Sequence, residues 1–163
     1  MKHQKIYFYA IILFLGLLPY SLNAQSKAER SFKEIVDSKQ YKIEVNYAHP
    51  QSGRLINLTS NYSLTIKNDS LDSYLPFFGR AYSIPYGGGN GLIFKSSIKD
   101  YKIEKEKKKE IRIKVETVTP EDSYTFFITV YKNLSADINV MMNKRSSIRF
   151  TGKLEEIEES TEE

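Results

Sequence analysis

The stretch YKIEKEKKKEIRIKV, residues 101–115, is the clearest indication of the fold class of this chain. Apolar and charged residues alternate on both sides of the polar connection EKKK, residues 106–109. The alternating apolar residues are Tyr101, Ile103, Ile111, Ile113 and Val115. A period of two places such side chains on one face of a sheet. The stretch therefore predicts an antiparallel hairpin with one buried and one solvated face.

The same alternation recurs along the rest of the chain. Residues 124–131 are apolar on both faces, which indicates a central strand covered on both sides. Further strands are expected at 41–47, 55–59, 62–66, 92–94, 136–140 and 147–154. Turn-forming residues separate these runs, so about nine or ten strands follow one another with short connections. The pattern predicts a mainly β (α+β) fold, either a bent antiparallel sheet or a β-sandwich, with one N-terminal helix.

The expected helix lies ahead of the first strand. Ser26 and Glu29 have the spacing of a capping box. Apolar residues then recur at helical intervals, so residues 27–38 are predicted to form a short amphipathic helix. Its apolar side needs a surface to cover, and we expect it to pack on the sheet.

The N-terminus has the pattern of a secretory signal. Lys2 and Lys5 precede an apolar run that Pro19 interrupts, and small residues follow up to Ala24. We interpret residues 1–24 as a signal peptide. The alternative is a retained membrane anchor, but a spanning helix needs about 20 apolar residues and this run is shorter.

The absence of cysteine limits how this protein can be anchored and stabilised. The sequence contains no cysteine, which excludes disulfides, a thiol nucleophile and a lipid attached to cysteine. Because of the signal peptide, we expect an exported protein, periplasmic or secreted, with no membrane span after signal cleavage. Because there is no cysteine, we expect that it is not lipid-anchored. Residues 25–154 are long enough for a single β-rich domain with its own core. Residues 155–163, EEIEESTEE, are expected to form a solvated acidic tail.

Few residues offer catalytic or metal chemistry. His49 is the one histidine after residue 24, and it precedes a proline in an expected turn. Asp69 and Asp72 are the carboxylates on which a hydrolase would depend, and with Asn68 they offer oxygens to calcium. They lack the spacing of a calcium-binding loop, so no metal and no cofactor is expected. Nucleic-acid binding by the basic run 105–114 would need aromatics and arginines placed beside it, and export from the cell disfavours nucleic acid as a partner.

The segment LPFFGRAYSIPYGGGNG, residues 75–91, breaks the strand pattern. Its glycines at 87–91 match neither a phosphate-binding loop nor a dinucleotide fingerprint, and they predict a turn. Pro76 and Gly79 indicate a bend or bulge. Arg80 has three possible partners, namely an aromatic ring, a buried carboxylate or a ligand anion. The candidate ligand-binding residues are Phe77, Phe78, Arg80, Tyr82 and Tyr86.

This segment resembles the signature of a family of exported Bacteroidota proteins known only as a domain of unknown function. The resemblance rests on Leu75 to Ala81 and on Gly91 to Phe94, and it covers roughly residues 27–155. It implies export and no assigned activity.

Three functions remain open at this stage. The leading hypothesis is an exported, non-enzymatic domain that binds a small ligand, a polysaccharide or an envelope protein. The second is a purely structural envelope protein whose 75–91 segment is only a corner. The third is a hydrolase that depends on carboxylates such as Asp69 and Asp72.

Overall fold

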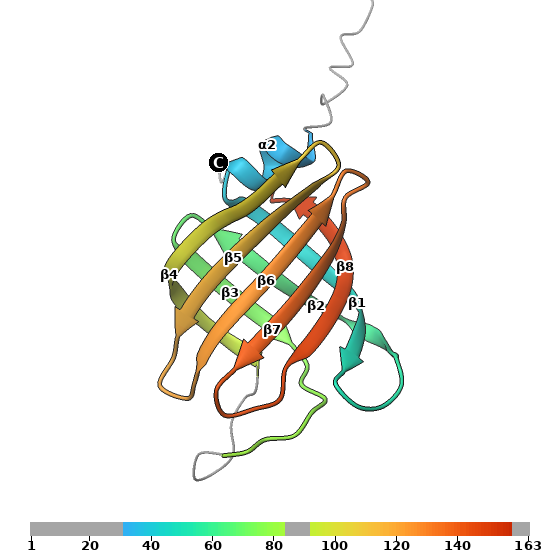
Figure 1. Cartoon of the computed structure of the whole chain (residues 1–163), viewed down its shortest axis with the longest axis vertical. Helices are drawn as coiled ribbons and strands as arrows, with labels where there is room; N and C mark the ends of the chain where they lie inside the picture. Colours follow the sequence, from blue (N-terminus) through green and yellow to red (C-terminus); the bar gives the residue numbers. More distant parts are fainter. Residues whose placement is uncertain (1–30, 84–91, 158–163) are drawn as a thin grey trace, which may run out of the picture.

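The computed structural model describes residues 31–83 and 92–157, which form one helix and eight strands (Figure 1). The helix is α2 (Phe32–Asp37). The strands are β1 (Gln40–Pro50), β2 (Ile56–Lys67), β3 (Ser70–Leu75), β4 (Leu92–Lys107), β5 (Glu110–Val118), β6 (Ser123–Tyr131), β7 (Ser135–Met142) and β8 (Ile148–Glu156). The prediction of a mainly β, antiparallel fold with one short helix is confirmed.

The sheet closes into a barrel in the order β1 to β8. Each strand pairs with its sequence neighbours, and β1 pairs with β8 from Tyr41–Glu156 to Pro50–Ile148. The expected open sheet or sandwich of nine to ten strands is therefore wrong. Closure leaves no strand edge unpaired. Antiparallel sheets often close in this way, because an unpaired edge can pair with another chain.

The strand count was too high because polar residues inside two long strands were interpreted as breaks. The expected strands 55–59 and 62–66 both fall in β2, which begins at Ile56, and 92–94 and 101–105 are parts of β4. Cross-strand bonds satisfy polar groups of β4. The Ser96 hydroxyl lies 2.7 Å from Thr117 Oγ1, and Thr117 donates to the Ser97 carbonyl at 2.8 Å.

The hairpin that indicated the fold is present as β4 and β5. Tyr101 pairs with Val115 and Ile103 with Ile113. The buried side chains of this hairpin join those of the other strands in one core inside the barrel. On β6, Phe126 and Ile128 face this core, but Phe127 lies outside and is half-buried. The expectation that β6 is covered on both faces is therefore wrong, because its second face is the outer wall.

The helix α2 has its N-cap at Ser31, five residues after the predicted N-cap Ser26. Ser31 accepts a hydrogen bond from the Glu34 amide at 3.3 Å, and Glu34 accepts one from the Ser31 amide at 2.9 Å. This is a capping box. Ile35 and Val36 are buried against the barrel, so the helix packs on the sheet as expected.

Several predictions fall on residues that the structure does not describe. These are the signal peptide at 1–24, the cap at Ser26, Tyr86, the glycines at 87–91 and the tail after Ile157. Strand β8 includes Glu155 and Glu156, the first two residues of the expected tail. Within residues 31–83 and 92–157, no helix is long and apolar enough to cross a membrane.

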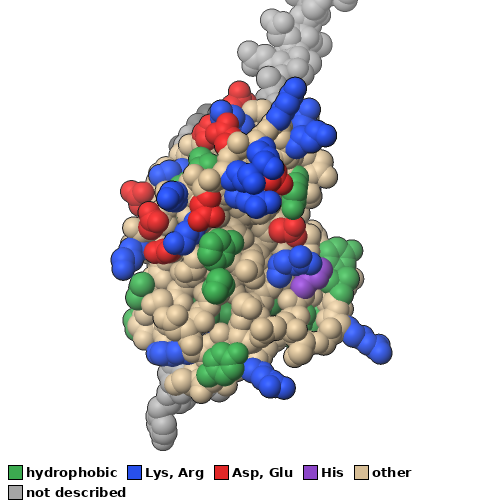
Figure 2. All heavy atoms as spheres, viewed as in Figure 1, with side chains coloured by type: hydrophobic (Ala, Val, Ile, Leu, Met, Phe, Trp, Pro, Cys, Tyr) green, Lys and Arg blue, Asp and Glu red, His purple; other side chains and the backbone are tan. Residues whose placement is uncertain are grey.

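The charges on the outer wall are mixed in sign. Figure 2 shows acidic and basic side chains interspersed over the half nearer α2, with fewer charges over the opposite half. Such mixing is typical of a solvated surface.

Candidate functional site

The two ends of the barrel are built differently (Figure 1). The helix α2 and the tight turns after β2, β4 and β6 lie at one end, which we call the helix end. The connections after β1, β3, β5 and β7 lie at the other, which we call the loop end. The segment that follows Leu75 starts at the loop end.

Hydrogen bonds hold the backbone of this segment to the β7–β8 connection. The Arg80 amide donates to Ser146 Oγ at 3.0 Å, and the Ser146 amide donates to the Arg80 carbonyl at 2.9 Å. The Tyr82 amide donates to the Lys144 carbonyl at 2.8 Å. These bonds fix the main chain without using the side chains of Arg80 and Tyr82.

Gly79 permits this close approach. A Cβ atom at this position would lie 2.5 Å from Ser146 Oγ and 2.6 Å from Cζ of the Phe77 ring. Both distances are shorter than a van der Waals contact, so any larger residue must displace its neighbours. The glycine is needed for packing.

Phe77 lies beneath the segment and belongs to the wall of the core. It is partly buried and packs against core residues. The guanidinium of Arg145 lies over its ring, 5.6 Å from the centroid. Arg145 is only 7% exposed and forms an ion pair with Glu121 at 3.6 Å. The arginine that stacks on an aromatic ring of the segment is therefore Arg145, which sequence analysis did not identify.

Asp122 holds the β7–β8 connection from the other side. This buried carboxylate accepts hydrogen bonds from the amides of Ser123 at 2.8 Å, Asn143 at 3.2 Å and Lys144 at 2.9 Å. Bonds to a charged acceptor are stronger than those between neutral groups. Asp122 thus stabilises the loop on which the 80–83 segment rests. Sequence analysis did not identify it.

A pocket of about 270 Å³ opens at the loop end beside this segment. Its lining residues come from three connections and are Gln51, Ser52, Phe78, Gly79, Arg80, Tyr82 and Ser146. Phe78 is 38% exposed and Tyr82 68% exposed, and Arg80 is also exposed. We call this hollow the loop-end pocket.

The structure brings three of the five candidate residues together. Phe78, Arg80 and Tyr82 line the loop-end pocket, whereas Phe77 faces the core below it. Tyr86 lies outside the described residues. No sequence signal pointed to Gln51 and Ser52, which come from a different connection, or to Ser146.

The lining of the pocket combines charged, aromatic and polar side chains. Arg80 supplies a cation with several donors, Phe78 and Tyr82 supply ring faces, and Gln51 and Ser52 supply an amide and a hydroxyl. Among the described residues, no group of three or more metal-ligating side chains is present.

The other candidate residues lie elsewhere. Asp69 is exposed in the β2–β3 turn, and Asp72 lies on the outer face of β3, 3.0 Å from the Lys95 ammonium. His49 is half-buried at the end of β1, where its Nε2 bonds to Thr151 Oγ1. Burial, aided by nearby Arg149, lowers the pKa of His49 below its ordinary value.

These features define a small, closed antiparallel barrel that carries a pocket among the loops of one end. The model of a family described as a domain of unknown function (DUF4251) matches residues 23–154, and the chain belongs to this family. The match confirms the expected membership of a domain-of-unknown-function family and assigns no activity.

A crystal structure of a DUF4251 family protein from Bacteroides eggerthii is similar to this chain, with a TM-score of 0.59 and 18% identity. The alignment covers 76% of this chain and 84% of that one. At this identity the likeness concerns the fold alone. A search of curated proteins gave no match.

Proposed function

We propose that this protein is an exported, non-enzymatic domain of the cell envelope that binds a small ligand, or the end of a larger one, in the loop-end pocket. The proposal rests on one observation. Phe78, Arg80 and Tyr82 are exposed into a shared hollow, while hydrogen bonds to the β7–β8 connection hold the backbone beneath Arg80 and Tyr82.

This combination favours binding because the site is already ordered. A ligand that meets a fixed backbone loses less free energy to ordering than one that meets a loose loop. Within residues 31–83 and 92–157, the Arg80 guanidinium forms no ion pair. Its charge is therefore available to an anionic group.

The volume of the pocket limits the size of the ligand. Pockets for drug-sized molecules span about 300–1,000 Å³, and the loop-end pocket is slightly smaller than this range. It suits a compact molecule, or a terminal group of a chain, that combines a negative charge with a flat face. A sugar acid at the end of an envelope polysaccharide meets both conditions.

Export is supported by the pattern of residues 1–24 alone. Mass spectrometry of the protein purified from its native cells tests it. Export predicts a mature N-terminus at Gln25, and an intact Met1 in the soluble cell fraction would contradict it.

The binding test compares matched arginine variants. A thermal-shift screen with small anionic metabolites and sugar acids should yield ligands that stabilise the protein. Arg80→Ala should abolish that shift, and Phe78→Ala should weaken it. Arg112→Ala, which removes an exposed guanidinium from the outer face of β5, is the control. If Arg80→Ala and Phe78→Ala only lower the melting temperature, with no effect on any ligand, the pocket has a structural role.

A further inference from the structure

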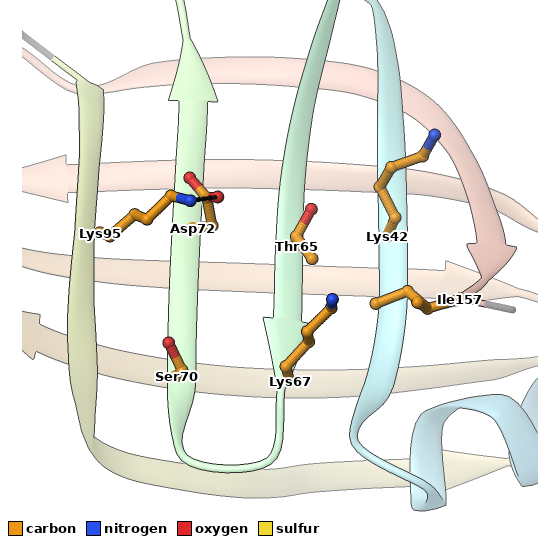
Figure 3. Close-up of a pocket in the computed structure, with 7 residues that line it drawn as sticks. All are labelled: Lys42, Thr65, Lys67, Ser70, Asp72, Lys95 and Ile157. Carbon is orange, nitrogen blue, oxygen red and sulfur yellow. Dashed lines mark ion pairs between the residues drawn. The ribbon is translucent and has the colours of Figure 1, made fainter. Parts of the chain in front are cut away.

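The outer face of strands β1 to β4 carries a second, distinct hollow near the helix end (Figure 3). Cross-strand pairing places Lys42 beside Thr65, Thr65 beside Asp72, and Asp72 beside Lys95. Because these residues occupy one row and point outward, their side chains lie over the same surface. We call this hollow the lysine pocket.

The lysine pocket has a volume of about 400 Å³. It contains three ammonium groups, from Lys42, Lys67 and Lys95, and one carboxylate, from Asp72. Thr65 and Ser70 add hydroxyls, and Ile157 forms an apolar side. The pocket shares no lining residue with the loop-end pocket.

The charge in this pocket is only partly neutralised. Lys95 pairs with Asp72 at 3.0 Å and Lys42 with Glu155 at 3.0 Å, and all four side chains are at least 39% exposed. Exposed pairs of this kind contribute little to stability, so a ligand can replace them at low cost. Lys67 forms no ion pair within the part of the chain that the structure describes. The surface therefore has unpaired positive charge for an anion.

Aromatic rings lie next to this charged row. Tyr74 follows Asp72 by two residues, so it points to the same outer face. It is 47% exposed, and its ring stacks on that of Tyr62 at 5.4 Å between centroids. Its cross-strand partner Ile93 is 42% exposed. The outer face thus combines a cationic hollow with an adjoining flat, apolar surface.

We propose that this face binds an acidic polysaccharide, a chain of sugar rings that carry carboxylates. The lysines would pair with the carboxylates, and the hydroxyls of Thr65 and Ser70, together with Asp72, would bond to sugar hydroxyls. Tyr74 would pack against the apolar face of the next ring, because an exposed aromatic ring offers both a flat contact and a polar edge. A simple acidic peptide would use the lysines but would not need the tyrosine platform.

The experiment measures binding of the purified protein to polygalacturonate and to its methyl ester. The ester has the same sugar chain without the charges, so the pair isolates the role of the carboxylates. We expect binding to polygalacturonate that weakens with added salt, and little binding to the ester. Lys67→Glu should weaken binding about tenfold or more, because it removes an ammonium and adds a carboxylate. Tyr74→Ala should also weaken it.

Controls separate this site from general electrostatics. Lys108→Glu makes the same charge change in the β4–β5 turn and should leave binding nearly unchanged. Arg80→Ala should also leave it unchanged, so this proposal and that for the loop-end pocket can fail independently. Deleting residues 158–163, which carry four glutamates, should strengthen binding.

Three results would overturn the proposal. The first is absence of binding to polygalacturonate. The second is equal loss of binding in Lys67→Glu and Lys108→Glu, which would indicate nonspecific charge attraction. The third is equally tight binding to polyglutamate that does not change in Tyr74→Ala, which would indicate an acidic peptide as the partner.

Discussion

The helix end and the loop end of this barrel use their side chains in opposite ways. At the helix end, Ile35 and Val36 are buried, and the hydroxyls of Tyr41 and Tyr101 lie 3.1 Å apart beneath the helix. At the loop end, backbone bonds hold the 80–83 segment, and the side chains of Arg80 and Tyr82 are exposed. Exposed side chains on a fixed backbone are candidates for function, because they are not needed to close the barrel.

The largest expected effect comes from removing the packing of the helix end. Ile35→Ala should lower the free energy of unfolding by roughly 2–5 kcal/mol, since it empties a buried site between α2 and the barrel. Urea denaturation measures this. Lys33→Ala, on the exposed side of the same helix, is the control. A near-zero effect of Ile35→Ala would mean that the helix does not seal the core.

A smaller loss of stability is expected from removing the carboxylate that holds the β7–β8 connection at the loop end. Asp122→Ala removes the acceptor of three backbone amides and should cost about 1.5–3 kcal/mol. It should also speed hydrogen exchange at the amides of Tyr82 and Asn143, which mass spectrometry or NMR detects. Asp100→Ala changes an exposed acid on β4 and serves as the comparison. Unchanged hydrogen exchange at the Tyr82 amide would show that the 80–83 segment does not depend on Asp122.

The smallest expected effect is a pH dependence at His49. Because burial lowers the pKa of His49 in the folded state, the unfolded state binds more protons as the pH falls below about 6.5. The contribution of His49 to stability is therefore complete above that pH and declines as the pH falls toward the folded pKa. Melting temperatures between about pH 7.5 and 5.5 should fall less for His49→Asn than for the parent protein. An identical decline of the melting temperature in both proteins would mean that other titratable groups cause the pH dependence.

Alternation predicted most of the strands because it depends only on which side chains face the core, but it predicted no strand at β3 (Ser70–Leu75). The hairpin at 101–115 follows from local residues. Closure could not be predicted, since the pairing of Tyr41 with Glu156 joins opposite ends of the domain and leaves no local pattern. The length of β4 was missed because its serines are satisfied by Thr117, a residue on another strand.

The sequence predicted the segment that forms the candidate site, but it did not predict which of its side chains line the pocket. Pro76, Gly79 and the neighbouring aromatics interrupt a strand pattern, so the sequence itself marked the segment. Nothing distinguished Phe77 from Phe78, and only the tertiary structure places one ring under Arg145 and the other in the pocket. Asp122 and Arg145 lie in ordinary turn sequences, and their roles arise entirely from the loops that they contact.

The most direct test compares Arg80 with Arg145, two arginines of the loop end, by urea denaturation. Arg145 is buried over Phe77 and paired with Glu121, so Arg145→Ala should cost about 1–3 kcal/mol of unfolding free energy. Arg80 is exposed in the pocket, and Arg80→Ala should stay within about 0.5 kcal/mol of the parent protein. Equal destabilisation by the two variants would contradict the claim that Arg80 is free for a ligand.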